Sequence, residues 1–266
     1  LGIAALPLFY LGLRSTFDPE SSAIATILLA FSWPAIFYAQ EVRAYGAVLF
    51  TMALAAPIWA QILRGDSRDI PWRLLTAFLG LNLLSAALHP FGMILGTFMY
   101  AYLFLSLLRH RPVISVAAAM SAAVVIGAYG AWFMSTAWVA QEIVTNGIVF
   151  SRPGLGFFID IGAFLYHHPI PLVLTAAIPV AIGARPFISR INEHGLDLRS
   201  PQFFLPIMIV APFAFVFILS QFQPFIYTRH LIVFLPFLFI LIAIIFQSRD
   251  WGHLKKATPA VVFLLC

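Results

Sequence analysis

Charged residues are scarce in this chain: Asp, Glu, Lys and Arg together make up 9% of its 266 residues. Soluble domains carry roughly a quarter charged residues and less than half apolar ones, whereas 62% of this chain is hydrophobic. A single water-soluble core would not bury that much apolar surface, so lipid has to be the solvent for much of the chain. The composition therefore excludes a globular, water-soluble domain.

Cysteine and clustered basic residues are also nearly absent. The only cysteine is Cys266, so no disulfide can form within the chain. The net charge is +5, but the cations are spread thinly, without the runs of Lys and Arg that bind nucleic acid. No nucleic-acid partner is therefore expected. The sequence also lacks a P-loop, an HExxH motif, a nucleophile elbow and a dinucleotide-binding glycine pattern.

Long apolar runs between short charged breaks make up most of the sequence. Because a membrane-spanning helix needs ~20 mostly apolar residues, we predict an all-α polytopic transmembrane helical bundle with about 9–10 spans. The runs cover 1–13, 21–37, 44–63, 74–88, 91–108, 113–134, 161–184, 202–220, 230–246 and 257–266. The prediction is a single transmembrane domain over 1–266. The sequence starts and stops inside apolar runs, so it is expected to be a fragment.

Basic residues are divided unevenly between the two sets of alternate loops. One set holds twelve of the 15 Lys and Arg residues: Arg14, Arg64, Arg68, Arg73, Arg109, Arg111, Arg185, Arg190, Arg199, Arg249, Lys255 and Lys256. The other set holds Arg43, Arg152 and Arg229. The positive-inside rule makes the first set cytoplasmic and the second extracytoplasmic. The six tryptophans fall near predicted span ends, where we expect an aromatic belt: Trp33, Trp59, Trp72, Trp132, Trp138 and Trp251.

The densest polar cluster lies at an outer span boundary, between Pro34 and Tyr45. It contains Gln40, Glu41 and Arg43. An Arg beside lipid is costly without a partner, and Glu41 can be that partner. The planar guanidinium of Arg43 also suits phosphate, because it can bind two oxygens at once. The alternative is an interfacial ion pair that only anchors a helix end.

A second outer cluster, Tyr227-Thr228-Arg229-His230, opens the run at 230–246. A cation at a helix N-terminus adds to the positive end of the helix dipole, which favours a bound anion. The alternative is a snorkelling Arg beside an interfacial Tyr.

Histidines mark two further outer segments. The turn His89-Pro90-Phe91-Gly92 joins two predicted spans, and its histidine is also explained by a structural hydrogen bond. His167 and His168 are adjacent, but no Asp, Glu or Cys completes a ligand set at metal-binding spacing, so no metal site is expected. Two outer acids, Glu142 and Asp160, are interpreted as solvated loop residues, with roles as ion ligands or as bases left open.

Together these motifs resemble a known family. The stretch from Pro34 to Tyr45 resembles the P-x-x-x-Y-x-Q-E-x-R-x-Y signature of bacterial GT-C glycosyltransferases, the dolichyl-phosphate-mannose mannosyltransferase-like enzymes that include the aminoarabinose and Rgt-type transferases. The segment from Leu6 to Gly12 is similar to that family's second span, and the turn from His89 to Gly92 to its H-y-x-g position. The segment from Tyr227 to Pro236 resembles its late R-Y-l-x-x-x-x-P element, with His230 in place of the usual Tyr.

The resemblance implies an inverting membrane glycosyltransferase, transferring a hexosyl or pentosyl group from a polyprenyl-phosphate-linked donor to a lipid, glycan or protein acceptor. It places the enzyme in the bacterial inner membrane, among membrane lipids, with its active side extracytoplasmic. The donor phosphate is then expected to bind Arg43 and Arg229. The supporting residues are expected to be Gln40, Glu41, Tyr45, His89, Tyr227 and His230.

No cofactor is implied, although a divalent cation stays open. The family's acidic base lies in the first outer loop, which is expected upstream of Leu1. The catalytic residue is therefore unknown, and neither Glu142 nor Asp160 is an obvious substitute.

A polytopic transporter or flippase of a lipid-linked or small substrate is the main alternative. Transporters place ionisable or broken-helix sites near mid-membrane, whereas the charges here cluster at span ends. Prolines within the predicted spans keep this alternative open: Pro57, Pro179, Pro206, Pro212 and Pro236. A third hypothesis, a non-catalytic membrane assembly subunit, predicts that the outer arginines tolerate substitution.

Overall fold

The computed structural model describes residues 2–41, 44–65, 71–145, 152–154, 156–166, 189, 197–222 and 226–247. All regular secondary structure in these residues is helical, as the all-α prediction requires. The helices are α1 (Gly2–Arg14), α2 (Pro19–Phe31), α3 (Trp33–Gln40), α4 (Ala44–Arg64), α5 (Trp72–Leu88), α6 (Pro90–Leu107), α7 (Pro112–Thr145), α8 (Gly156–Tyr166), α10 (Pro201–Phe222), the 3₁₀ helix η1 (Thr228–Phe234) and α11 (Leu235–Gln247).

Local sequence signals set several of these boundaries. The carboxylate of Asp18 accepts the Ser21 backbone N–H at 2.8 Å, and Pro19 occupies the first turn of α2. Both features are typical of a helix start. The capping carboxylate accepts a backbone N–H that has no partner within the helix, and proline has no backbone N–H to satisfy. His89 ends α5 in an extended conformation with φ −163° and ψ 138°. Pro90 explains this, since proline disfavours the helical conformation in the residue before it.

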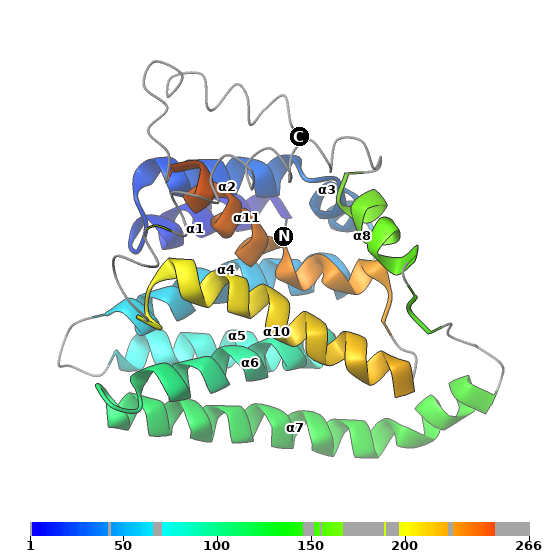
Figure 1. The fold of residues 1–266 in the computed structure, drawn as a ribbon. Coiled ribbons are helices and arrows are strands. Elements are labelled where there is room, and N and C mark those ends of the chain that lie inside the picture. The colour runs from blue at the N-terminus through cyan, green and yellow to red at the C-terminus, as the bar shows by residue number, and fades with distance from the viewer. Residues whose placement is uncertain are drawn as a thin grey trace.

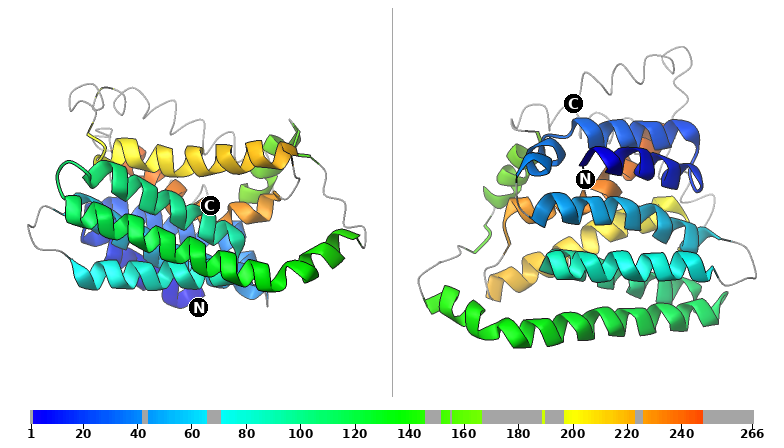
Figure 2. Two further views of the ribbon diagram at one scale, coloured as in Figure 1. Left: turned by 90° about the horizontal axis from the view of Figure 1, so that it is seen from below. Right: turned by 180° about the vertical axis from the view of Figure 1, so that it is seen from behind.

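The long helices are stacked side by side (Figures 1 and 2). In Figure 1, α1 and α2 lie at one side, α4 in the middle, and α5, α6 and α7 toward the other side, with α10 and α11 crossing the stack. Trp59 is at the centre of the core: it is fully buried, and its indole N–H donates to the Met99 carbonyl at 2.9 Å. Its ring also packs against Phe204 of α10 and Phe237 of α11. One buried tryptophan therefore joins α4, α6, α10 and α11.

The pairing of α5 with α6 depends on two glycines spaced as G-x-x-x-G. A Cβ on Gly92 would lie 2.6 Å from the Ser85 carbonyl oxygen, and a Cβ on Gly96 would lie 3.1 Å from Cγ of Asn82. Small residues at this spacing let two apolar helices approach closely where lipid offers no hydrophobic driving force. This contact fixes the turn at His89, which joins the two helices.

Five described helices are long and apolar enough to cross a membrane: Ala44–Arg64, Pro90–Leu107, Pro112–Ser135, Pro201–Phe222 and Thr228–Gln247. A sixth span is obtained if α2 and α3, which meet at a 54° bend, count as one. Helices α1 and α5 are apolar but shorter. The structure thus bears out an all-α chain with helices of membrane-spanning length. Most of the predicted runs at 161–184 and 257–266 lie outside the described residues.

The predicted run 113–134 matches the candidate span Pro112–Ser135, which lies within a longer helix, α7, of 34 residues. One sequence expectation needs correction. Trp59 is not an interfacial belt residue, because none of its surface is exposed and its N–H is bonded inside the core. Trp33, Trp72 and Trp132 are 42%, 58% and 50% exposed, as belt residues should be. The side chains of Trp138 and Trp251 lie outside the described part of the chain.

Arginines predicted to share one side do gather at one end of the bundle. The Arg64 guanidinium donates to the Thr16 carbonyl at 2.6 Å, and the Arg111 guanidinium donates to the Gly65 carbonyl at 2.8 Å. Arg64 ends α4, whereas Tyr45 is near its start. The tyrosine therefore lies at the end of the bundle opposite these arginines.

Candidate functional site

Four polypeptide segments meet at the end of the bundle that lies opposite Arg64. They are the last turn of α3, the first turn of α4, the turn between α5 and α6, and the start of η1. These segments carry Tyr38, Tyr45, His89 and His230, all of which were part of the motifs predicted from sequence. The structure thus brings together three motifs that are far apart along the chain.

Tyr45 is at the centre of this cluster. Its ring centroid lies 5.0 Å from Tyr38, 5.2 Å from His89 and 6.2 Å from His230. Gly46 allows the close approach of α3 and α4 here, because a Cβ on it would lie 2.7 Å from the Tyr38 carbonyl oxygen. Tyr38 also packs against Phe164 of α8, with ring centroids 6.1 Å apart.

His89 caps α6 as well as belonging to the cluster. Its Nδ1 accepts the backbone N–H of Phe91 at 3.2 Å, so the imidazole satisfies one of the free donors at the helix start. Burial and then the nearby positive charge of Arg229 lower the pKa of His89 from its ordinary 6.5 to about 4. The imidazole is therefore neutral around pH 7.

His230 makes a matching bond in η1. Its Nδ1 accepts the backbone N–H of Tyr227 at 3.1 Å, and the side chain is buried. The His230 ring centroid lies 5.0 Å from that of His89 and 4.4 Å from that of Phe91. The two histidines are therefore neighbours although they come from different ends of the sequence.

Arg229 brings the positive charge to this cluster. Its guanidinium carbon lies 4.5 Å from the centroid of the Tyr227 ring, a distance typical of a cation–π contact. Its Nε is buried and has no hydrogen-bond partner among the described residues. A buried guanidinium donor is costly unless something accepts from it, so an anionic ligand would suit this position.

The remaining predicted residues lie at the end of α3. Gln40 is its last residue and is exposed; Glu41 follows, half-buried, with its backbone N–H donating to the Phe37 carbonyl at 3.2 Å. Arg43, the other predicted phosphate-binding residue, lies outside the described residues, so its expected pairing with Glu41 stays a prediction. His167 and His168 also lie outside them.

Comparisons with protein-family models, with curated proteins and with solved structures found no match. The resemblance to GT-C glycosyltransferases therefore depends on the motif residues themselves.

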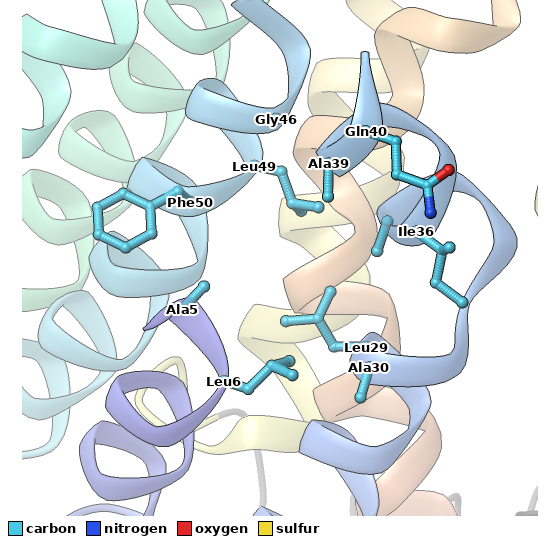
Figure 3. Close-up of a pocket in the computed structure, with 11 residues that line it drawn as sticks. Ala5, Leu6, Leu29, Ala30, Ile36, Ala39, Gln40, Gly46, Leu49 and Phe50 are labelled. Atoms are coloured by element: carbon cyan, nitrogen blue, oxygen red, sulfur yellow. The ribbon is translucent and has the colours of Figure 1, made fainter. Parts of the chain in front are cut away.

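An apolar cavity of about 390 Å³ lies beside the cluster, between α1, α2, α3 and α4 (Figure 3). Leu6, Leu29 and Leu49 reach into the space between these helices, and Gln40 lies at one end of it. Volumes of roughly 300–1,000 Å³ are usual for ligand sites. This cavity suits part of an apolar chain whose polar end lies near the end of α3.

Metal ligands do not gather in the part of the chain that the structure describes. No three His, Cys, Asp or Glu side chains among those residues are placed to hold a metal ion together. The described cluster instead combines one guanidinium, two imidazoles and the three phenols of Tyr38, Tyr45 and Tyr227. These groups can donate hydrogen bonds to an anion.

Sequence reasoning missed two members of the cluster. Phe164 was treated only as part of an apolar run, and Phe91 only as a spacer in the turn. Phe91 lies one residue beyond Pro90, so its position near His89 could have been expected. The contact of Phe164 depends on how α8 packs on α3, for which the sequence carries no signal.

Proposed function

We propose that this chain is part of a membrane glycosyltransferase that transfers a sugar from a polyprenyl-phosphate-linked donor to an acceptor at the extracytoplasmic face. In this proposal the chain is a GT-C-like bundle of about 9–10 spans in the bacterial inner membrane. The observation that carries the proposal is the meeting of the Tyr38–Tyr45, His89–Gly92 and Tyr227–His230 segments at one end of the bundle. These are the segments whose motifs resemble the family.

The electrostatics of the cluster fit a phosphate-linked donor. Arg229 offers a guanidinium with a buried Nε that no described residue accepts from. A leaving polyprenyl phosphate develops negative charge, and preorganised donors that stabilise such charge are usually a large part of catalysis. Arg229 would supply that stabilisation, together with Arg43 as the sequence motif predicts.

The apolar cavity between α1 and α4 supports the lipid part of the donor. Gln40 lies both at one end of that cavity and next to Glu41, the start of the polar segment. A polyprenyl phosphate has the same layout: an apolar chain that ends in a charged headgroup. A water-soluble sugar nucleotide would leave the cavity without a role.

Sugar transfer by the full-length protein in membranes tests the proposal. Transfer from a radiolabelled polyprenyl-phosphate sugar is expected for the wild type and should fall about a hundredfold in Arg229→Ala, since removing one charge-stabilising donor typically costs that much. Arg229→Lys, which keeps the charge without the planar fork, should recover part of it. Full activity in the alanine variant would rule out this residue as a phosphate ligand.

A transporter remains the second candidate because of one observation, the break between α2 and α3. The two helices pass the length and hydropathy criteria only as a pair bent by 54°, and Ser32 and Pro34 lie at the break. Discontinuous helices are typical of transporter substrate sites. Uptake of a lipid-linked or small substrate by proteoliposomes, in the absence of any sugar acceptor, would favour this function over transfer.

A further inference from the structure

His89 and His230 share an arrangement that decides where their protons lie. In each ring Nδ1 accepts a backbone N–H, from Phe91 at 3.2 Å and from Tyr227 at 3.1 Å. A ring nitrogen that accepts a hydrogen bond carries no proton. In a neutral imidazole the proton is then on the other nitrogen, Nε2, which becomes a donor.

The same bonds keep both rings uncharged. If Nδ1 were protonated, its N–H would point at the backbone N–H that it now accepts. The hydrogen bond to the backbone would then be lost, and the helix start would be left uncapped. The groups that face the pair reinforce this: Arg229 on η1 is cationic, while Tyr45 on α4, Tyr227 before η1 and Phe91 on α6 pack their rings against the histidines. A nearby cation disfavours a second positive charge on either ring.

An Nε2 that carries a proton has no lone pair to use. It cannot take a proton from an acceptor hydroxyl as a general base, and it cannot coordinate a metal ion. The remaining chemistry of the pair is to donate hydrogen bonds to an electron-rich group.

We propose that His89 and His230 form a pair of uncharged Nε2–H donors for the anionic group that binds beside Arg229. This inference depends on the proposed function, because the anion is taken to be the phosphate of the lipid-linked donor. It assigns both histidines to ligand binding and excludes them as the catalytic base and as metal ligands. The two rings, with centroids 5.0 Å apart, are close enough to bind oxygens of one phosphate group.

Substitution by asparagine or by glutamine tests the roles of Nδ1 and Nε2 of each histidine independently. Asn is a good helix cap and places its side-chain oxygen near the Nδ1 position, where it can accept the backbone N–H. His89→Asn and His230→Asn therefore keep the backbone hydrogen bond but remove the Nε2–H donor. Gln places its amide N–H near the Nε2 position but loses the cap. The Asn variants should therefore keep the thermal stability and lose affinity, whereas the Gln variants should lose stability and keep more of the affinity.

The experiment measures binding of geranylgeranyl phosphate to the full-length protein in lipid nanodiscs. Each Asn variant is expected to raise Kd by roughly ten- to a hundredfold, which is the effect of losing one hydrogen bond to a charged group. Wild-type affinity in both Asn variants would overturn the inference while leaving the transferase proposal to its own activity assay. Absence of binding by the wild type would overturn both.

Nitrogen-15 NMR of the wild type with labelled histidine tests the tautomers without any variant. Chemical shifts that place the proton of both rings on Nε2 at pH 7 would support the inference. Shifts that place it on Nδ1, or a Zn²⁺ titration that moves both imidazole signals at one equivalent, would overturn it.

Discussion

The ring of Tyr45 lies 5.2 Å from the imidazole of His89, centroid to centroid, although the two residues belong to different sequence motifs. Tyr45 is in the first turn of α4, and His89 is in the turn that joins α5 and α6. Both α4 and α6 therefore begin at this end of the bundle. Substitution at either residue should affect the same proposed ligand site.

Tyr227 provides a direct test of how Arg229 is held. Tyr227→Phe keeps the aromatic face under the guanidinium and should reduce sugar transfer by no more than about threefold, because a cation–π contact needs only the ring. Tyr227→Ala removes that support and should reduce kcat/KM by about tenfold, given a contact of roughly 1–2 kcal/mol. Equal activity of the two variants would show that the contact does not position Arg229.

The two glycines of α6 should be intolerant of side chains. Gly92→Ala and Gly96→Ala place a Cβ against Ser85 and Asn82, and overpacking of this kind typically costs 1–3 kcal/mol. The thermal unfolding midpoint in detergent should fall accordingly. Gly80→Ala on α5 is the matched control, because a Cβ there meets no atom within 4 Å. That variant should be neutral or gain up to about 1 kcal/mol from the better helix propensity of Ala.

Stability should depend on pH through His89. Its pKa is lowered to about 4 in the folded chain, against an ordinary value of 6.5, so the unfolded chain binds more protons between these values. Stability is then full above pH 6.5 and is lost as the pH falls toward 4. The melting midpoint of the wild type should drop over this window. His89→Asn should show a shallower drop, and the difference between the two curves isolates this residue from the carboxylates.

Trp59 should matter for stability far more than the exposed tryptophans. Trp59→Ala removes a fully buried ring and its hydrogen bond to Met99, with an expected cost of about 3–5 kcal/mol. Trp72→Ala, at a residue 58% exposed, should change the melting midpoint little in detergent. A similar loss in both variants would contradict the central role of Trp59 in joining the helices.

The sidedness of the bundle can be measured with single cysteines after Cys266→Ser. Gln40→Cys is expected to react with a membrane-impermeant maleimide added from the extracytoplasmic side, and Arg109→Cys only after the membrane is opened. The reason is the excess of basic residues at the Arg109 end. Reversed labelling would invert the orientation and with it the proposed location of the polar cluster.

Much of this fold was predictable because membrane spans depend on local properties. Apolar run length placed α4, α6 and α10 within a residue or two, and Pro90 predicted the turn between α5 and α6. Trp59 shows where such reasoning fails: its position near a helix end suggested the interface, but its burial depends on which helices surround it. That choice is made by tertiary packing, which a pattern along one chain does not specify.

The candidate site was likewise predictable in its residue types but not in its detailed conformation. The sequence singled out Tyr45, His89, Arg229 and His230 by residue type and by their side of the membrane. It did not predict that both histidines would accept backbone N–H groups at Nδ1, because this needs the extended conformations of His89 before α6 and of Tyr227 before η1. Those conformations set the proton positions, and hence the chemistry, of the two rings.

The 34 residues of α7 correspond to about 51 Å of helix, whereas the hydrocarbon layer of a bilayer is about 30 Å thick. Fitting such a helix inside that layer would need a tilt of more than about 50°, beyond the range of roughly 0–40° seen for membrane helices. The stretch Pro112–Ser135 is itself long and apolar enough to cross that layer, since its 24 residues correspond to about 36 Å of helix. The remaining ten residues of α7, to Thr145, are therefore more helix than a single crossing of the layer requires.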